Sequence, residues 1–527
     1  MRIARIAALT FALASRVEAQ APASVESIQT KPERTNFEQT STYEDVTAFL
    51  NALALGAPKR IHVRAFGTTS ENRALPLVVV GAPSASPEAV RKTGKIRVYI
   101  QGNIHAGEVE GKESAQMLLR DLAAGKHDDW LKTMVFLVAP IYNADGNERV
   151  SLTSRGRQHG PIGGQGQRPN AQGLDLNRDH MKLDSPEAKA VVKLMTEYDP
   201  HVSIDLHTTN GTRHAYHLTY SPPLNPATDP AIVDLLRKEW FPAVTKSIRD
   251  KHGWHYYYYG NLEGGRGSEE RAWRSFDHRP RFNNNYIGLR NRFALLSEAY
   301  AYATFKDRIV ATSRFVEESL HFVASHARQI RGIVERSDKT RLIGSQLSVR
   351  AKLAKSADSV EILLGEVSEE KHPKDGHIMD LRKDVMRPEQ MPEYGVFEST
   401  ETERVPTFYF VPPGLPEVAE RLNAHGIRAT FLTQATTMNV QEFQIDGNTQ
   451  AASAFQNHRE RTLTGKWVPA RRKLEAGSLV IPMNQPLARL AFYLIEPRSD
   501  DGLANWNFLD AALGAEAKIY PIVRSVR

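Results

Sequence analysis

Short apolar segments alternate with longer segments of helical periodicity between about residues 60 and 335, and this alternation limits the possible folds more than any other feature of the chain. The order predicts strands at 61–65, 75–80, 96–101, 134–139, 202–206, 215–219 and 293–297, and helices at 110–124, 186–198, 230–251 and 305–334. Ser185 followed by Pro186 is typical of a helix start. Apolar strands that alternate with helices indicate an α/β layer with both faces of the sheet covered.

Beyond residue 335 the sequence changes to short apolar segments separated by polar ones. Strands are predicted at 347–353, 360–364, 407–411, 430–433, 479–482, 490–495 and 519–523, with one helix at 417–425. The charged stretch 366–375 is typical of a solvent-exposed loop. We therefore expect residues 336–527 to form a second, mostly β domain after an α/β domain of residues 45–335.

The N-terminus has the composition of a signal peptide. Residues 1–5 carry two arginines, residues 6–14 are apolar, and Val17 and Ala19 are small residues before a cleavage point. We expect residues 1–19 to direct export to a periplasmic or extracellular site and residues 20–44 to form an irregular lead-in. The apolar run is too short to cross a bilayer and no later one is long enough, so no membrane span is expected.

The composition excludes several function classes. The chain has no Cys, which removes disulfide scaffolds, Cys-ligated zinc, iron–sulfur clusters and thiol nucleophiles. The formal net charge is +7, but the basic residues are scattered along the chain, so no nucleic-acid partner is expected. A metal site in this protein has to be built from His, Asp and Glu.

Two segments that follow predicted strands carry candidate metal ligands. His105 and Glu108 form an H-x-x-E pair between the strand 96–101 and the helix 110–124, and His207 follows the strand 202–206. Ligand sites in open α/β sheets gather at this carboxyl edge, and zinc accepts imidazole together with carboxylate ligands.

Further motifs occur in a fixed order along the α/β part. They are N-I-H-A-G-E at 103–108, N-A-D-G at 143–146, R-x-N…G-x-D-L-N-R at 168–178, S-I-D-L-H at 203–207 and L-L-S-E at 295–298. Together they resemble the M14 zinc carboxypeptidases, the funnelin family, over about residues 45–335, and the β-rich tail is similar to that of large exported bacterial relatives. The resemblance implies a mixed sheet flanked by helices.

The resemblance also implies a catalytic metal site. His105, Glu108 and His207 match ligands of one Zn²⁺ per chain, with the fourth position left to a water molecule whose pKa the metal lowers. Glu298 matches the general base that takes the proton of this water. Asp175 matches the carboxylate that orients the imidazole of His105.

Three matches concern the substrate. Arg168 matches the arginine that stabilises the oxyanion, although Arg155 and Arg157 in the same loop compete for this role. Asn177 and Arg178 match the pair that binds the terminal carboxylate of the substrate.

The residues that cover the substrate and select its side chain are less defined. Tyr286 is our candidate for the family's tyrosine over the bound substrate, and the run 256–259 of four tyrosines also precedes Glu298. The three asparagines 283–285 are candidates for the pocket that accepts the C-terminal side chain.

The expected function is that of a zinc metallocarboxypeptidase acting on peptides with a free C-terminus. One alternative is a zinc-dependent amidohydrolase of N-acyl amino acids, because Asn177 and Arg178 would bind a carboxylate in either enzyme. The other is a non-catalytic peptide-binding protein, which predicts the loss of a ligand or of the base. His105, Glu108, His207 and Glu298 are all present.

Overall fold

The computed structural model describes residues 24–263 and 270–526, so the predicted signal peptide 1–19 lies outside the described residues. Part of the predicted lead-in is regular instead of irregular. It contains η1 (Val25–Ser27) and α1 (Lys31–Arg34), and α2 (Tyr43–Gly56) begins before its end. A capping box between Thr42 and Asp45 starts α2.

The α/β part is built on one mixed sheet of eight strands, in the order β1-β2-β4-β3-β5-β10-β6-β7. β4, β3, β5 and β10 run parallel, whereas β1, β2 and the β10–β6 pair are joined antiparallel. The strands are β1 (Ile61–Thr68), β2 (Ala74–Val80), β3 (Ile96–Gly102), β4 (Met134–Ala139), β5 (Val202–Thr208), β6 (Leu218–Ser221), β7 (Tyr256–Tyr258) and β10 (Phe293–Ala299). The predicted mixed sheet is therefore confirmed.

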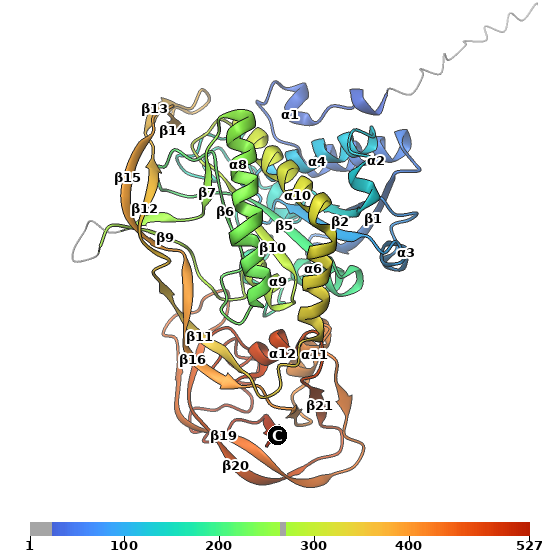
Figure 1. Ribbon diagram of the computed structural model, residues 1–527, viewed down its shortest axis with the longest axis vertical. Coiled ribbons are helices and arrows are strands. Elements are labelled where there is room, and N and C mark those ends of the chain that lie inside the picture. The colour runs from blue at the N-terminus through green and yellow to red at the C-terminus, as the bar shows by residue number, and fades with distance from the viewer. Residues whose placement is uncertain (1–23, 264–269, 527) are drawn as a thin grey trace, which may run out of the picture.

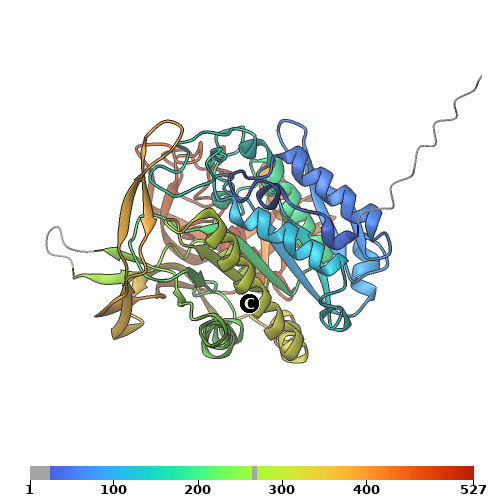
Figure 2. The same ribbon diagram turned by 90° about the horizontal axis from the view of Figure 1, so that it is seen from above.

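Helices cover both faces of this sheet. Besides α2, the α/β part contains the helices α3 (Pro87–Lys92), α4 (Glu110–Ala123), α5 (Ala144–Asn147), α6 (Pro186–Tyr198), α7 (Pro230–Leu235), α8 (Phe241–His252), α9 (Asn283–Leu289) and α10 (Phe305–Lys339). It also contains the short helical segments η2 (Trp130–Lys132), η3 (Leu176–Arg178) and η4 (Leu236–Trp240). α8 and α10 contact each other on one face (Figures 1 and 2).

Alternation along the buried strands divides the apolar side chains between two cores. In β2, Val78 and Val80 pack with α2, α4, α8 and α10, whereas Leu77 and Val79 pack with α6 on the opposite face. Successive strand residues point to opposite faces, so a strand that is apolar throughout is buried on both sides.

The C-terminal region is mostly β, as predicted. Much of it lies below the α/β part in Figure 1, whereas the strands within residues 357–394 lie beside that part, at the upper left. Its strands are β11 (Gln346–Ala354), β12 (Ala357–Leu364), β13 (Val367–Lys371), β14 (Ile378–Arg382), β15 (Arg387–Tyr394), β16 (Val396–Arg404), β17 (Phe408–Val411), β18 (Thr430–Phe431), β19 (Thr436–Gln450), β20 (Arg461–Leu474), β21 (Leu479–Pro482) and β22 (Val523–Ser525). Two helices, α11 (Pro416–Ala424) and α12 (Ala488–Ile495), lie among them.

Three local predictions for this region are wrong. The segment 519–523 does not form one strand, since β22 begins only at Val523 and Ile519 makes an isolated bridge with Gln444. The segment 490–495 belongs to the helix α12 and not to a strand, because a short apolar run that is buried all round has no period that separates the two. The charged stretch 366–375 contains β13, which pairs with β14 in an antiparallel hairpin.

The C-terminal region is joined to the α/β part by packing and by strand pairing. α10 continues past the predicted boundary at residue 335. β15 pairs with β9 (Ala272–Arg274), which in turn pairs with β8 (Asn261–Glu263). The core on the α6 face of the sheet also contains the apolar side chains of α12. Within the part of the chain that the structure describes, no helix is long and apolar enough to cross a membrane.

Candidate active site

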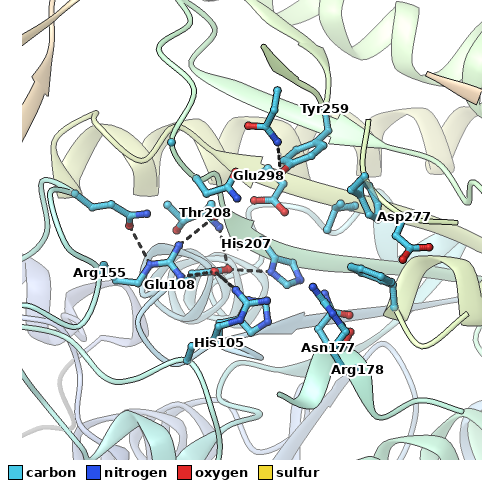
Figure 3. A pocket seen from close by; sticks show the side chains of 18 of the residues that line it. His105, Glu108, Arg155, Asn177, Arg178, His207, Thr208, Tyr259, Asp277 and Glu298 are labelled. Carbon is cyan, nitrogen blue, oxygen red and sulfur yellow. Dashed lines mark hydrogen bonds and ion pairs between the residues drawn. The ribbon is translucent and has the colours of Figure 1, made fainter. Parts of the chain in front are cut away.

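The ends of β3, β5 and β10 bring the predicted metal ligands and base together (Figure 3). His105 and Glu108 follow β3 in the turn before α4, and His207 lies near the end of β5. β5 and β10 are parallel, and their register places Glu298 directly beside His207. The order of the strands therefore brings together His105 and Glu298, which are 193 positions apart in the sequence.

The three candidate ligands converge on one point. Nδ1 of His105 and Nδ1 of His207 each lie 2.9 Å from an oxygen of the Glu108 carboxylate. One ligand atom from each residue lies within 4.8 Å of the others, and all three side chains are buried. Two imidazole nitrogens and a carboxylate form a donor set that suits zinc.

A carboxylate holds the far nitrogen of each imidazole. Nε2 of His105 lies 3.1 Å from Oδ1 of Asp175, and Nε2 of His207 lies 2.9 Å from Oδ2 of Asp205. Such partners fix the ring so that the other nitrogen faces the metal. Both Nδ1 atoms face the same point, so the residues present fit a zinc ion.

The charges around the site shift several pKa values. Burial opposes ionisation of Asp175, but the neighbouring His105 and Arg168 hold its pKa well below the ordinary value. Burial raises the pKa of Glu298 to about 8, and the negative charge of Glu108 adds to this effect. Glu298 is thus a carboxyl group able to hold and release a proton near neutral pH.

Two arginines contact the metal-site carboxylates. Arg155 Nη1 lies 2.9 Å from Oε1 of Glu108, and Arg168 Nε donates a 2.9 Å hydrogen bond to Oδ2 of Asp175. Arg157 is directed elsewhere, since its Nη2 pairs with Asp380 at 2.6 Å. All three arginines line the same cavity as His105, Glu108, His207 and Glu298.

Asn177 and Arg178 line this cavity from η3. The Asn177 backbone N–H donates to Oδ1 of Asp175 at 2.9 Å, and its side-chain oxygen accepts a 2.8 Å hydrogen bond from the backbone of Asn283. The guanidinium carbon of Arg178 lies 3.8 Å from the centre of the Phe282 ring. This stacking holds a cationic donor group on the cavity wall.

The comparison with known families agrees with this geometry. The zinc carboxypeptidase family, Peptidase M14, matches residues 46–263, a range that includes the three candidate ligands. Residues 46–263 thus resemble a zinc carboxypeptidase domain. The matched range ends before Glu298, which the strand register places beside His207.

Similar proteins include other carboxypeptidases. Carboxypeptidase 2 of Trichophyton tonsurans is 25% identical over 499 residues, which cover 91% of this chain and 86% of the relative. Carboxypeptidase B of Astacus astacus is 26% identical over 136 residues, covering 24% and 42%. A metallo-carboxypeptidase structure from Burkholderia cenocepacia aligns with a TM-score of 0.40 at 18% identity, covering 55% of this chain and 70% of that one.

The prediction that Tyr286 covers the substrate of the carboxypeptidase domain is wrong. α9 turns Tyr286 into the core, where it is fully buried and its hydroxyl lies 2.8 Å from Nδ1 of His425. The asparagines 283–285 are also buried in α9 and do not line the cavity, so they cannot select a substrate side chain. Tyr259, the last of the four consecutive tyrosines, does line the cavity (Figure 3).

Sequence reasoning missed two residues of the site. Asp205 was detectable, because D-x-H on one strand places both side chains on the same face, beside one another. Asp277 lies on the cavity wall, where its carboxylate accepts a 2.7 Å hydrogen bond from Nε of Arg279. No motif marks Asp277, since it lies in an irregular segment whose path depends on tertiary packing.

Proposed function

We propose that the chain is a zinc-dependent metallocarboxypeptidase that removes the C-terminal residue from peptides with a free carboxylate. One observation carries the proposal. A single cavity of about 670 Å³ is lined by the His105–Glu108–His207 cluster, by Glu298 and by Arg178. A metal site, a proton acceptor and a cation thus face one space large enough for the end of a peptide.

The metal-site residues are arranged before any substrate binds. Zinc held by His105, Glu108 and His207, one ion per chain, would polarise the scissile carbonyl and lower the pKa of a coordinated water. Asp175 and Asp205 orient the two imidazoles, each through Nε2. Substrate binding therefore does not have to reorganise these rings.

Glu298 moves the proton. Its carboxylate takes a proton from the attacking water and delivers it to the nitrogen of the leaving amine. In the metal-free chain, burial raises the pKa of Glu298 to about 8, so its environment favours the protonated form that this transfer requires.

Arginines bind the two negative charges of the reaction. Arg178, together with the side chain of Asn177, binds the terminal carboxylate of the peptide. Arg168 stabilises the developing oxyanion, because its partly exposed guanidinium faces the cavity and lies 3.9 Å from Glu108. Arg155 is closer to Glu108 and remains the competing residue for this role.

The proposal includes the site of action. The basic and apolar composition of residues 1–19 supports export to the periplasm or the extracellular medium, where the enzyme would meet peptide substrates.

A peptide library read by mass spectrometry tests the function. Zinc-loaded protein is incubated with peptides in two matched forms, one with a free C-terminus and one amidated, and with N-acetyl amino acids. We expect loss of single C-terminal residues from the free peptides, at least about tenfold slower cleavage of the amidated peptides, and inhibition by a zinc chelator.

Hydrolysis of the N-acetyl amino acids alone would establish the amidohydrolase instead. Binding of free peptides without any cleavage by the zinc-loaded protein would contradict an enzymatic role.

A further inference from the structure

A turn of the C-terminal region reaches the loop that carries Asp175. This turn lies in residues 451–460, which connect β19 to β20. The Asp175 backbone N–H donates a 2.8 Å hydrogen bond to Oε1 of Gln456. Nearby, Nε2 of His458 lies 2.8 Å from Oδ2 of Asp184. The segment is thus attached to the carboxypeptidase domain on both sides of η3.

Asp175 is the residue through which this contact acts on the site. Oδ1 of Asp175 meets Nε2 of His105 and the backbone N–H of Asn177, and Oδ2 accepts a hydrogen bond from Arg168. One carboxylate therefore connects a metal ligand, an arginine of the cavity and the first turn of η3. Its own main chain is held by Gln456.

The backbone of Gln456 is strained. Phe455 and His458 exchange two backbone hydrogen bonds, of 2.8 and 3.0 Å, around a two-residue turn. The turn residues Gln456 and Asn457 have φ of 49° and 67°. Such turns favour Gly, Asn or Asp at both positions, and a glutamine is uncommon there. A residue kept in a strained conformation points to a role of its side chain.

We propose that Gln456 is a positioning residue of the active site. By accepting the Asp175 N–H it fixes the carboxylate that orients His105 and the turn that carries Asn177 and Arg178. The C-terminal region thereby completes the substrate-binding loop of the carboxypeptidase domain. The effect on catalysis rests on the proposed function, whereas the effect on Asp175 and on metal binding does not.

Two glycine substitutions separate positioning from folding. Gln456→Gly relieves the positive φ and removes the hydrogen-bond acceptor. Asn457→Gly relieves the neighbouring positive φ and leaves the acceptor in place, so it is the matched control. Glycine adopts this conformation without strain, and we expect both variants to unfold at the wild-type temperature or above it.

We expect Gln456→Gly to expose the Asp175 amide to faster hydrogen exchange, measured on the full chain by mass spectrometry. The zinc dissociation constant, measured by chelator competition, rises about three- to tenfold, which is the range of one lost hydrogen bond. KM for free-carboxylate peptides rises by a similar factor while kcat stays within about twofold. Asn457→Gly keeps the wild-type values of all three.

The inference is overturned if exchange at Asp175 is unchanged in Gln456→Gly, or if it changes while the zinc affinity stays at the wild-type value. Equal effects of the two variants would overturn it as well, because they would assign the effect to the turn and not to the side chain. If the wild-type protein cleaves no peptide, the proposed function fails, and exchange and zinc affinity still decide the role of Gln456.

Discussion

Glu298 lies in an environment that opposes its charge, and this has a consequence for stability. Its pKa rises from an ordinary 4.5 to about 8 in the folded, metal-free chain, mainly through burial. Between these values the folded state holds a proton that the unfolded state has released. The free energy of unfolding therefore falls as the pH rises through this window.

The substitution Glu298→Gln should separate catalysis from stability. The neutral amide cannot accept the proton of water, so kcat should fall by about 10²–10⁴-fold while zinc is retained. The amide also has no charge to bury. Metal-free Glu298→Gln should therefore unfold at a temperature a few degrees above metal-free wild type at pH 8, with little difference at pH 4.5, as measured by calorimetry. An equal difference at both pH values would show that the carboxylate is not the cause.

The predicted positions of single residues agree with the structure where a motif fixes both the residue and its neighbours. His105 and Glu108 lie in one turn, and His207 ends a strand, so local sequence placed all three at the sheet edge. The prediction for Tyr286 failed because α9 is buried along its whole length, and the tertiary packing of that helix places the ring inside the protein. The local sequence does not indicate whether a given face of this helix packs against the core or lines the cavity.

Among the elements, the buried strands were the most predictable. β4 and α6 have the predicted bounds, since a run of buried apolar residues or a Ser-Pro start defines each of them locally. The hairpin β13–β14 was not predicted, because a charged and largely exposed strand has the composition of a loop. Asp380 in β14 is buried, and its backbone N–H donates a 2.8 Å hydrogen bond to the carbonyl of Arg157.

The ion pairs between this hairpin and Arg157 predict that substitutions of Asp380 and Glu369, the two carboxylates that contact this arginine, have unequal effects. Asp380 is buried and Glu369 is exposed, yet each carboxylate lies 2.6 Å from Nη2 of the arginine. Asp380→Asn should lower the free energy of unfolding by about 1–3 kcal/mol and raise KM about two- to fivefold, because Arg157 lines the cavity. Glu369→Gln should cost less than about 1 kcal/mol. Urea unfolding and initial rates measure both, and equal losses would contradict the structural role of the buried pair.

The α/β part and the C-terminal region are less independent of one another than the sequence indicates. The change of composition near residue 335 predicted two domains, but one apolar core contains side chains from α6, α9 and α12. The composition of a segment indicates which helices and strands it forms, but it does not indicate which part of the protein packs against them. All eight residues of α12 are buried, so this helix closes a face of the α/β part that would otherwise meet water.

A chain that ends after Thr340, just beyond α10, tests this dependence. It keeps every candidate zinc ligand, Glu298 and the eight-stranded sheet, but it loses α12 and the turn that contains Gln456. We expect most of this fragment to be insoluble when it is produced under conditions that give soluble full-length protein, with no cooperative thermal transition in the remainder. We expect this loss of solubility and of cooperative unfolding because the apolar face that α12 covers becomes exposed. The active-site residues are not the cause, since the fragment contains their charged members. Cooperative unfolding of the fragment with wild-type zinc affinity would show that the carboxypeptidase domain folds alone, and would also remove the need for Gln456.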